Sequence, residues 1–378
     1  MNGQEPSHLN SLDIARGIAA FAVVLFHWNA LFLVGSEFPE FYLPARQPAY
    51  AFLRVFYEHG HAAVSLFFTL SGFIFFRFFA RRIASGTLRL SEFFVQRVSR
   101  LYPLHLATLL IVAAGQAVYH AQRAQFYGTA SNTTQDFVFS LFMLPSSNDG
   151  TGLSFNGPSW TVSVEMFLYA MFFVYCITAR PRLPVMAAIV LIGFLILGPV
   201  RPALGVGVGS FFLGGCMAIV CEYVSRSARR KYLVMAIILA SLLLWIAAIL
   251  LPIRQVGAIC IVAPLGGGVD LLTTVLFPLT ILALALWEGE KPAAFCRFAN
   301  ATRLGPLSYS VYLLHFPFQL GIVVVTGFFG ISSDVFYSPV VLAAFIVALV
   351  TLGLLSHYSF EMPIQRMIRS VFVEKSAS

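Results

Sequence analysis

The sequence predicts an all-α fold: a polytopic bundle of about ten transmembrane helices with both termini in the cytoplasm. Of the 378 residues, 59% are hydrophobic and only 11% are charged, whereas a soluble domain carries about 25% charged residues. Apolar side chains must therefore face lipid as well as the protein core. The apolar residues also form runs of about 20, the length that a spanning helix needs, and basic residues collect between alternate runs.

The candidate spans fill most of the chain. In order they are 14–34, 61–80, 101–119, 160–179, 183–200, 205–224, 232–251, 270–288, 305–327 and 336–357. The shorter run Phe137–Leu144 ends at Pro145, and we interpret it as re-entrant or interfacial. The segment 252–269 is ambiguous and can hold a further partial span. With no linker or repeat between the runs, 1–378 is expected to be a single transmembrane domain without a separate soluble domain.

The basic residues predict the orientation. Of the 24 Lys and Arg residues, only five fall outside when the N-terminus is placed in the cytoplasm: Arg46, Arg54, Arg123, Arg201 and Arg254. The other 19 lie inside, as cytoplasmic loops require. Membrane topology thus accounts for the net charge of +8. Membrane lipid is the expected partner of this surface, and no nucleic-acid partner is predicted.

The five cysteines do not indicate a metal site. Most lie within or beside predicted spans, and no two form a Cys-x-x-Cys pair. The sequence therefore predicts neither a disulfide framework nor a zinc site.

The first span, SLDIARGIAAFAVVLFHWNALFLV, carries three polar groups. His27 follows Arg16 by eleven residues, which in a helix makes about three turns and places both on one face, roughly 16 Å apart. Asp13 falls near the same line. His27 is either a buried histidine bonded to a neighbouring helix or a general base. Asp13 and Arg16 form either an interfacial ion pair or part of the same site.

The second span and the loop after it hold two further candidates. Ser71 precedes Gly72 within an apolar run, a pair that permits close helix approach or a bend and that we favour over a Ser nucleophile. Arg97 and Arg100 are three residues apart, so on a helix they point the same way. Paired guanidinium groups can hold phosphate oxygens. The alternative is that they only mark a cytoplasmic loop.

Polar residues also interrupt two later spans. Glu165 is the single acid of the run WTVSVEMFLYAMFF, and a carboxylate there can bind an acceptor hydroxyl, orient His27 or make a structural hydrogen bond. Tyr309 and His315 belong to a polar stripe in 305–327 and are supporting candidates, with a structural role favoured for His315.

These residues recur in motifs that resemble the acyltransferase-3 family of bacterial membrane O-acyltransferases. Arg16 and His27 are similar to the Arg-x10-His signature of that family. Five further segments resemble its motifs in the same order: LFFTLSGFIFF (66–76), RVSRLYP (97–103), PSWTVSVEMFLY (158–169), LSYSVYLLHFP (307–317) and FEMPIQR (360–366). One departure is Met166, where many members carry a second acid after the position of Glu165.

The resemblance implies the activity and the sites. It implies transfer of an acetyl or other short acyl group from cytoplasmic acyl-CoA to an extracytoplasmic acceptor, in the bacterial inner (cytoplasmic) membrane. Acetyl-CoA would be a donor substrate, with no tightly bound cofactor. The acceptor would be a carbohydrate or glycolipid such as lipopolysaccharide O-antigen or exopolysaccharide, or a macrolide or other small glycoside. His27 would be catalytic with Arg16 and Glu165, and Arg97 and Arg100 would bind the donor.

Two other function classes fit the same composition. A transporter or flippase of a lipid-linked sugar also needs spans and polar residues at mid-membrane, but it does not need a pair of donor-binding arginines. A non-catalytic membrane sensor is disfavoured because no attached soluble domain is predicted to receive its signal.

Overall fold

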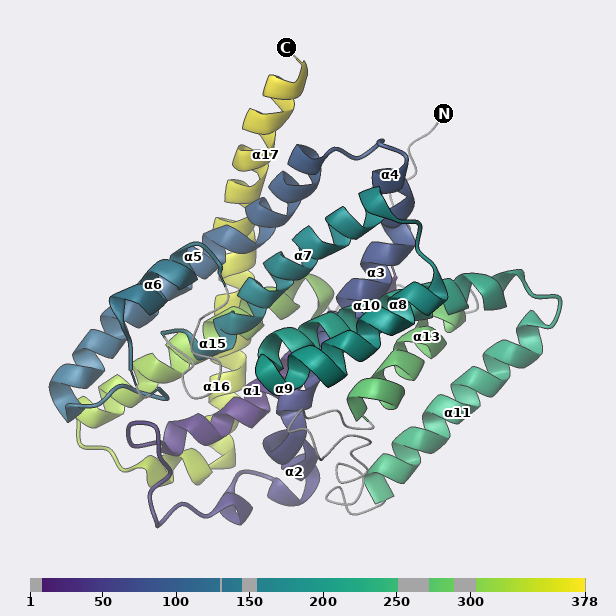
Figure 1. Cartoon of the computed structure of the whole chain (residues 1–378). Coiled ribbons are helices and arrows are strands. Elements are labelled where there is room, and N and C mark those ends of the chain that lie inside the picture. The colour runs from purple at the N-terminus through teal and green to yellow at the C-terminus, as the bar shows by residue number, and fades with distance from the viewer. Residues whose placement is uncertain (1–8, 130, 145–154, 251–271, 289–303, 378) are drawn as a thin grey trace. The chain divides into compact units, whose positions relative to one another are not determined.

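The computed structural model describes residues 9–129, 131–144, 155–250, 272–288 and 304–377 (Figure 1). Within these residues the regular structure is helical, with one isolated β-bridge between Val34 and Glu37, so the predicted all-α fold is confirmed. The chain forms two compact units. Unit 1 comprises 1–19, 64–89 and 167–305, and unit 2 comprises 20–63, 90–166 and 306–378.

Nine helices of the described part are long and apolar enough to cross a membrane. They are Asn10–Phe32, Tyr50–Phe78, Leu90–Arg123, Gly157–Thr178, Leu183–Val200, Pro202–Arg226, Arg230–Ile249, Leu304–Phe328 and Pro339–Phe372. The predicted span 270–288 corresponds to the shorter apolar helix Leu272–Trp287, and the ambiguous segment 252–269 lies outside the described residues. The cytoplasmic location of the termini stays a prediction.

Unit 1 is built mainly from the middle of the chain. It contains α3 (Ala63–Phe78), α4 (Ala80–Ala84), α8 (Leu183–Leu191), the π-helix η5 (Ile192–Leu197), α9 (Gly198–Val200), α10 (Pro202–Arg226), α11 (Arg230–Leu250), the π-helix η7 (Leu272–Leu276), α13 (Phe277–Trp287), the first part of α1 (Asn10–His27) and most of α7 (Trp160–Thr178).

Helices α3 and α10 of unit 1 meet backbone to backbone. A Cβ atom on Gly72 would lie 1.8 Å from the carbonyl oxygen of Phe211, and one on Gly214 would lie 1.9 Å from that of Thr69. Any larger residue would push the helices apart, which is why small residues mark such contacts in membranes. The close approach predicted from Ser71-Gly72 is confirmed.

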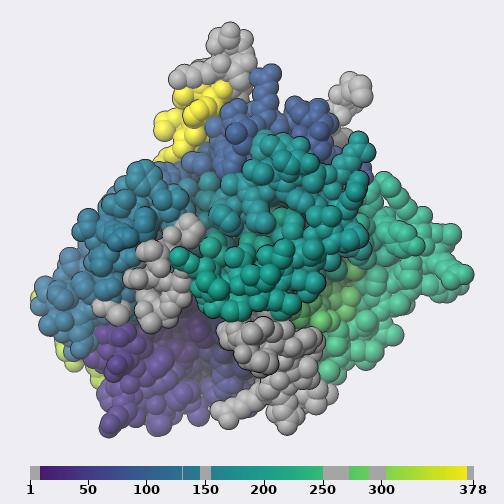
Figure 2. Space-filling view, in the orientation of Figure 1, coloured from purple at the N-terminus to yellow at the C-terminus, as the bar shows by residue number. Residues whose placement is uncertain are grey.

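The surface of unit 1 is apolar where a soluble protein would be polar. Helix α11 presents Met235, Leu243 and Ile249 with 66%, 56% and 64% of their surface exposed, and it lines the right edge of Figure 2 in green. Such a face is stable only against lipid or another apolar surface.

Unit 2 combines both ends of the chain with one central stretch. It contains the end of α1, the 3-10 helices η1 (Trp28–Phe32), η2 (Pro44–Arg46), η3 (Gly60–Ala62), η4 (Gly157–Ser159) and η8 (Ser333–Tyr337), the start of α7, the π-helix η9 (His357–Glu361), and α2 (Tyr50–His59), α5 (Leu90–Arg123), α6 (Thr134–Leu141), α15 (Leu304–Phe328), α16 (Pro339–Ser356) and α17 (Met362–Ala377). The predicted span 61–80 starts earlier in the structure, at Tyr50, because α2 and η3 lead directly into α3.

Helix α15 lies at the centre of unit 2. One hydrophobic core joins Val311 of α15 to η1 and to α16 through Trp28 and Phe345. A second core joins Phe316 and Leu320 of α15 to α5. Because α15 packs on both sides, its polar residues between Ser310 and Gln319 are buried in the protein.

Helices α5 and α15 run side by side in the same direction. The Tyr309 hydroxyl donates to the carbonyl of Leu101 at 2.6 Å, and eleven residues later in α15 Leu320 packs against Gly115. His315 therefore lies between these two contacts, roughly 15 Å along α5 from Ser99 by the helical rise of about 1.5 Å per residue.

The predicted short apolar segment forms α6, whose eight residues are too few to span a membrane. Thr133 and Asp136 make a capping box at its start, which satisfies the first backbone N–H groups. The imidazole of His105 on α5 holds the other end, 2.7 Å from the carbonyl of Ser140. The predicted re-entrant or interfacial position of this helix stays a prediction.

Candidate active site

His27 is the last residue of α1, where the chain tightens into η1. A helix end leaves backbone carbonyls without intrahelical partners. Here Asn29 Nδ2 donates to the carbonyl of Phe26 and Gln319 Nε2 to that of His27, both at 2.8 Å. These bonds fix the turn that presents His27.

The hydrogen bonds of His27 determine which ring nitrogen can react. Nδ1 lies 2.9 Å from the carbonyl oxygen of Val23. Because a carbonyl only accepts, Nδ1 carries the hydrogen of the neutral ring and Nε2 holds the lone pair. Among the described residues none hydrogen-bonds this Nε2. Nε2 is therefore available to accept a proton, and the role of His27 as a general base stays a prediction.

A second histidine packs against the first. The ring centroids of His27 and His315 are 4.9 Å apart, and His315 is fully buried. The Nδ1 of His315 donates to the carbonyl of Tyr312. Its Nε2 is buried and makes no hydrogen bond within the described part of the chain.

Tyr312 connects this pair to the start of α7. Its hydroxyl donates to the carbonyl of Pro158 and accepts from Thr161, both at 3.1 Å, and its ring lies 5.8 Å from that of His315. Glu165, one turn after Thr161, is half-buried and lies in the neighbourhood of Tyr312. Its predicted role toward His27 or an acceptor stays a prediction.

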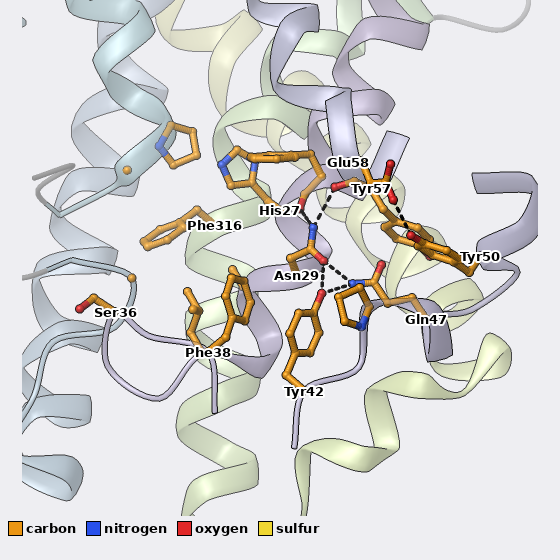
Figure 3. A pocket seen from close by; sticks show the side chains of 17 residues that line it. His27, Asn29, Ser36, Phe38, Tyr42, Gln47, Tyr50, Tyr57, Glu58 and Phe316 are labelled. Atoms are coloured by element: carbon orange, nitrogen blue, oxygen red, sulfur yellow. Dashed lines mark hydrogen bonds between the residues drawn. The ribbon is translucent and has the colours of Figure 1, made fainter. Parts of the chain in front are cut away.

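His27 forms part of the wall of a cavity of about 460 Å³ within unit 2, a volume in the range of small-molecule sites. Aromatic rings dominate the wall, including Phe38 and Phe316 (Figure 3). Phe38 and Tyr42 stack with ring centroids 4.5 Å apart and planes inclined at 15°. Apart from His27, the polar side chains of the wall come from residues 29–58.

Asn29, Tyr42 and Gln47 form a hydrogen-bonded hub in the cavity wall (Figure 3). Asn29 Oδ1 accepts from the Tyr42 hydroxyl and from Gln47 Nε2, and Gln47 Nε2 also contacts the Tyr42 hydroxyl. Burial raises the pKa of Tyr42 to about 12, so the phenol remains a donor over the whole physiological range.

Asp13 and Arg16 lie at the other end of α1, in unit 1. Arg16 Nη1 and Asp13 Oδ1 are 3.2 Å apart in an ion pair of half-buried side chains. One continuous helix carries Asp13, Arg16 and His27, as predicted. A catalytic role for Arg16 stays a prediction.

Arg97 and Arg100 lie one turn apart near the start of α5. The guanidinium carbon of Arg97 is 5.6 Å from the ring centroid of Phe93, a cation–π distance. Arg100 is exposed. Their common helix was predicted, and their donor-binding role stays a prediction.

Helix α17 brings a third arginine, Arg369, close to the start of α5. Arg369 Nε donates to Ser99 Oγ at 3.2 Å, and Nη2 donates to the carbonyl of Gln96 at 3.3 Å. Within the described residues neither Arg100 nor Arg369 pairs with a carboxylate. A group of like charges remains, which favours an anionic ligand.

Two supporting candidates have structural surroundings. Ser71 is half-buried beside the α3–α10 contact, and its hydroxyl makes no hydrogen bond to any described residue. Tyr309 joins α15 to α5 through the carbonyl of Leu101. As for metals, no group of three or more His, Cys, Asp or Glu in suitable positions occurs among the described residues.

Sequence reasoning missed Asn29, Gln47, Gln319 and Arg369. Asn29 and Gln319 carried a usable signal, since each is a lone amide within an apolar run. Gln47 lies in a predicted outer loop, and Arg369 was one basic residue among many on the inner side. Nothing in their local sequence separated these two from solvated loop residues.

The model of an acyltransferase domain matches residues 9–357. The chain belongs to the acyltransferase-3 family. It is therefore a multi-pass membrane acyltransferase, as the motifs predicted. The family match ends before α17, so Arg369 lies beyond it.

Three curated relatives are similar to this chain. Acyltransferase MdmB of Streptomyces mycarofaciens is 27% identical over 82% of this chain and 82% of its own length. Exopolysaccharide production protein ExoZ of Rhizobium meliloti is 25% identical over 82% of this chain and 91% of its own. Protein 2 in the picA locus of Rhizobium radiobacter is 32% identical over 30% of this chain, which spans about half of that relative (49%). No solved structure matches the chain significantly.

Proposed function

We propose that this acyltransferase moves an acetyl or other short acyl group from cytoplasmic acyl-CoA to a hydroxyl of an extracytoplasmic carbohydrate, across the bacterial inner membrane. The observation that carries the proposal is His27. Its Nδ1 is held by the carbonyl of Val23, and its ring lies in the wall of a cavity large enough for a sugar ring.

His27 supplies the proton chemistry of this transfer. Nε2 takes the proton of the acceptor hydroxyl while the hydroxyl oxygen bonds to the thioester carbonyl carbon. The carbon–sulfur bond then breaks, and the proton passes from His27 to the thiolate that leaves, which gives free CoA and an ester. His315 and Tyr312 hold His27 in position during both proton transfers.

The donor site is supplied by the arginine group, which consists of Arg97, Arg100 and Arg369. A CoA headgroup carries several negative charges and cannot enter lipid, so it needs cations at the membrane edge. Arg97, Arg100 and Arg369 gather near Ser99, and His315 lies roughly 15 Å further along α5. A pantetheine arm extended along this direction brings the thioester to the histidine pair.

A carbohydrate acceptor agrees with the relatives and with the cavity. ExoZ is an exopolysaccharide production protein by its name. Aromatic walls with a few fixed amides suit a ring that is apolar on its faces and polar at its edge. Glu165 would help to orient the acceptor or His27 through Tyr312.

The test uses protein purified in a detergent without a sugar headgroup and supplied with acetyl-CoA. Release of free CoA, and faster release when a carbohydrate acceptor is added, would support the proposal. Absence of both acetyl-CoA binding and CoA release would contradict it and favour a transporter of a lipid-linked sugar.

A further inference from the structure

Gln47 has a buried oxygen that the protein leaves without a partner. The residue is 3% exposed and lines the cavity that His27 also lines. Its Oε1 is buried and accepts no hydrogen bond from the described residues. Buried carbonyl oxygens are nearly always bonded, so this atom calls for an explanation.

The surrounding hydrogen bonds fix which end of the Gln47 amide is left over. Asn29 Nδ2 faces two backbone carbonyls, those of Phe26 at 2.8 Å and Tyr57 at 3.0 Å. Carbonyls only accept, so this atom must be the NH₂ group, and Asn29 Oδ1 is the acceptor on the other side. Gln47 must then turn its own NH₂ group toward Asn29. An amide flip is excluded, and Oε1 is the free end.

Tyr42 has no hydrogen left for Gln47. Its hydroxyl gives its only hydrogen to Asn29 Oδ1 and can then only accept from Gln47 Nε2. The Tyr42 hydrogen is thus unavailable to Gln47 Oε1. A ligand in the cavity that satisfies Oε1 must bring its own donor.

Carbohydrate chemistry meets this requirement. A sugar ring offers one hydroxyl as the nucleophile for His27 and further hydroxyls as donors. Its apolar faces suit aromatic rings such as the stacked pair Phe38 and Tyr42. An alcohol with a single hydroxyl can satisfy His27 Nε2 or Gln47 Oε1, but it cannot satisfy both.

We propose that Gln47 Oε1 accepts a hydrogen bond from a second hydroxyl of the acceptor, so that the cavity selects polyhydroxylated rings over simple alcohols. The inference rests on the proposed acyl transfer and adds the substrate feature that the site reads. Gln47 is then a specificity-determining residue, and the hub of Asn29 and Tyr42 holds it in position.

The experiment compares two acceptors of similar ring size, methyl β-glucopyranoside and cyclohexanol, with acetyl-CoA as donor. Wild-type protein should have the higher kcat/KM for the glucoside. In Gln47→Met, which keeps the side-chain length but removes Oε1, this preference should fall about three- to tenfold, the effect of one hydrogen bond. Tyr42→Phe disturbs the hub but keeps Oε1, so its preference should fall less.

Several other outcomes would contradict the proposed role of Gln47. Equal use of both alcohols by the wild type, or an unchanged preference in Gln47→Met, would overturn the role of Oε1. CoA release without acylation of either alcohol would also overturn it. None of these outcomes contradicts the proposed acyl transfer, which is contradicted only when acetyl-CoA is neither bound nor cleaved.

Discussion

His27 and His315 place their imidazole rings 4.9 Å apart, with ring planes inclined at 46°. Each ring directs its Nδ1 to a backbone carbonyl, of Val23 and Tyr312 respectively. Both rings therefore have the same tautomer, with the lone pair on Nε2. Since like charges at this distance repel, the pair can hold one added proton far more easily than two. We expect His27 to act as the base and His315 to shape its surroundings.

Replacement of His27 by Gln should lower kcat by about 10²- to 10⁴-fold, the usual contribution of a general base. The Gln amide fills much of the ring volume but cannot take a proton at neutral pH. Acetyl-CoA binding and the melting temperature should change little, because the arginine group lies elsewhere in unit 2. A purified His27→Gln protein with turnover within about twofold of wild type would remove His27 from the mechanism.

Replacement of His315 by Asn tests a positioning role. Asn can still donate to a backbone carbonyl but no longer packs a ring against His27, so kcat should fall while the KM for acetyl-CoA stays near its wild-type value. A merely structural role would instead lower the melting temperature without this split between kcat and KM. Tyr312→Phe is the matched variant, because it removes the bonds to Pro158 and Thr161 and keeps the ring.

Much of the fold follows from the sequence for a simple reason. The length of an apolar run and the position of its basic flanks are local properties, and the bilayer imposes them on every span. The break of α1 at His27 is different, because the apolar run continues through Trp28 and beyond. That break depends on Gln319, a residue 292 positions away.

The residues of the candidate site also fall into two groups, those that the sequence reveals and those that only the structure reveals. His27, Glu165, Arg97 and Arg100 are visible in the sequence because each is a charged or titratable group in or beside an apolar run. The importance of Gln47, in contrast, depends on the two backbone carbonyls that orient Asn29 and on the Tyr42 hydroxyl. Tertiary folding brings these groups together. The local sequence of the loop that contains Gln47 does not predict these neighbours.

Replacement of Arg369 by Gln should raise the KM for acetyl-CoA about tenfold, since a charge-assisted hydrogen bond to phosphate contributes about 1.5–3 kcal/mol. The KM for S-acetylpantetheine, which lacks phosphates, should not rise. Arg229→Gln serves as control, because Arg229 is an exposed arginine in the turn before α11. Equal effects on both donors would show that Arg369 only fastens α17 to α5.

Replacement of Gly72 by Val should destabilise the protein, whereas Ser71→Ala beside it should not. The Cβ atom that the substitution adds would start 1.8 Å from the Phe211 carbonyl oxygen, so α3 and α10 would have to separate, at a cost of about 1–3 kcal/mol or more. Ser71→Ala removes a hydroxyl that no described residue bonds, and its activity should stay near wild type. Thermal unfolding of both variants in detergent measures the first effect, and CoA release measures the second. If Ser71→Ala lost activity while remaining folded, the serine would have a chemical role that its surroundings in α3 do not suggest.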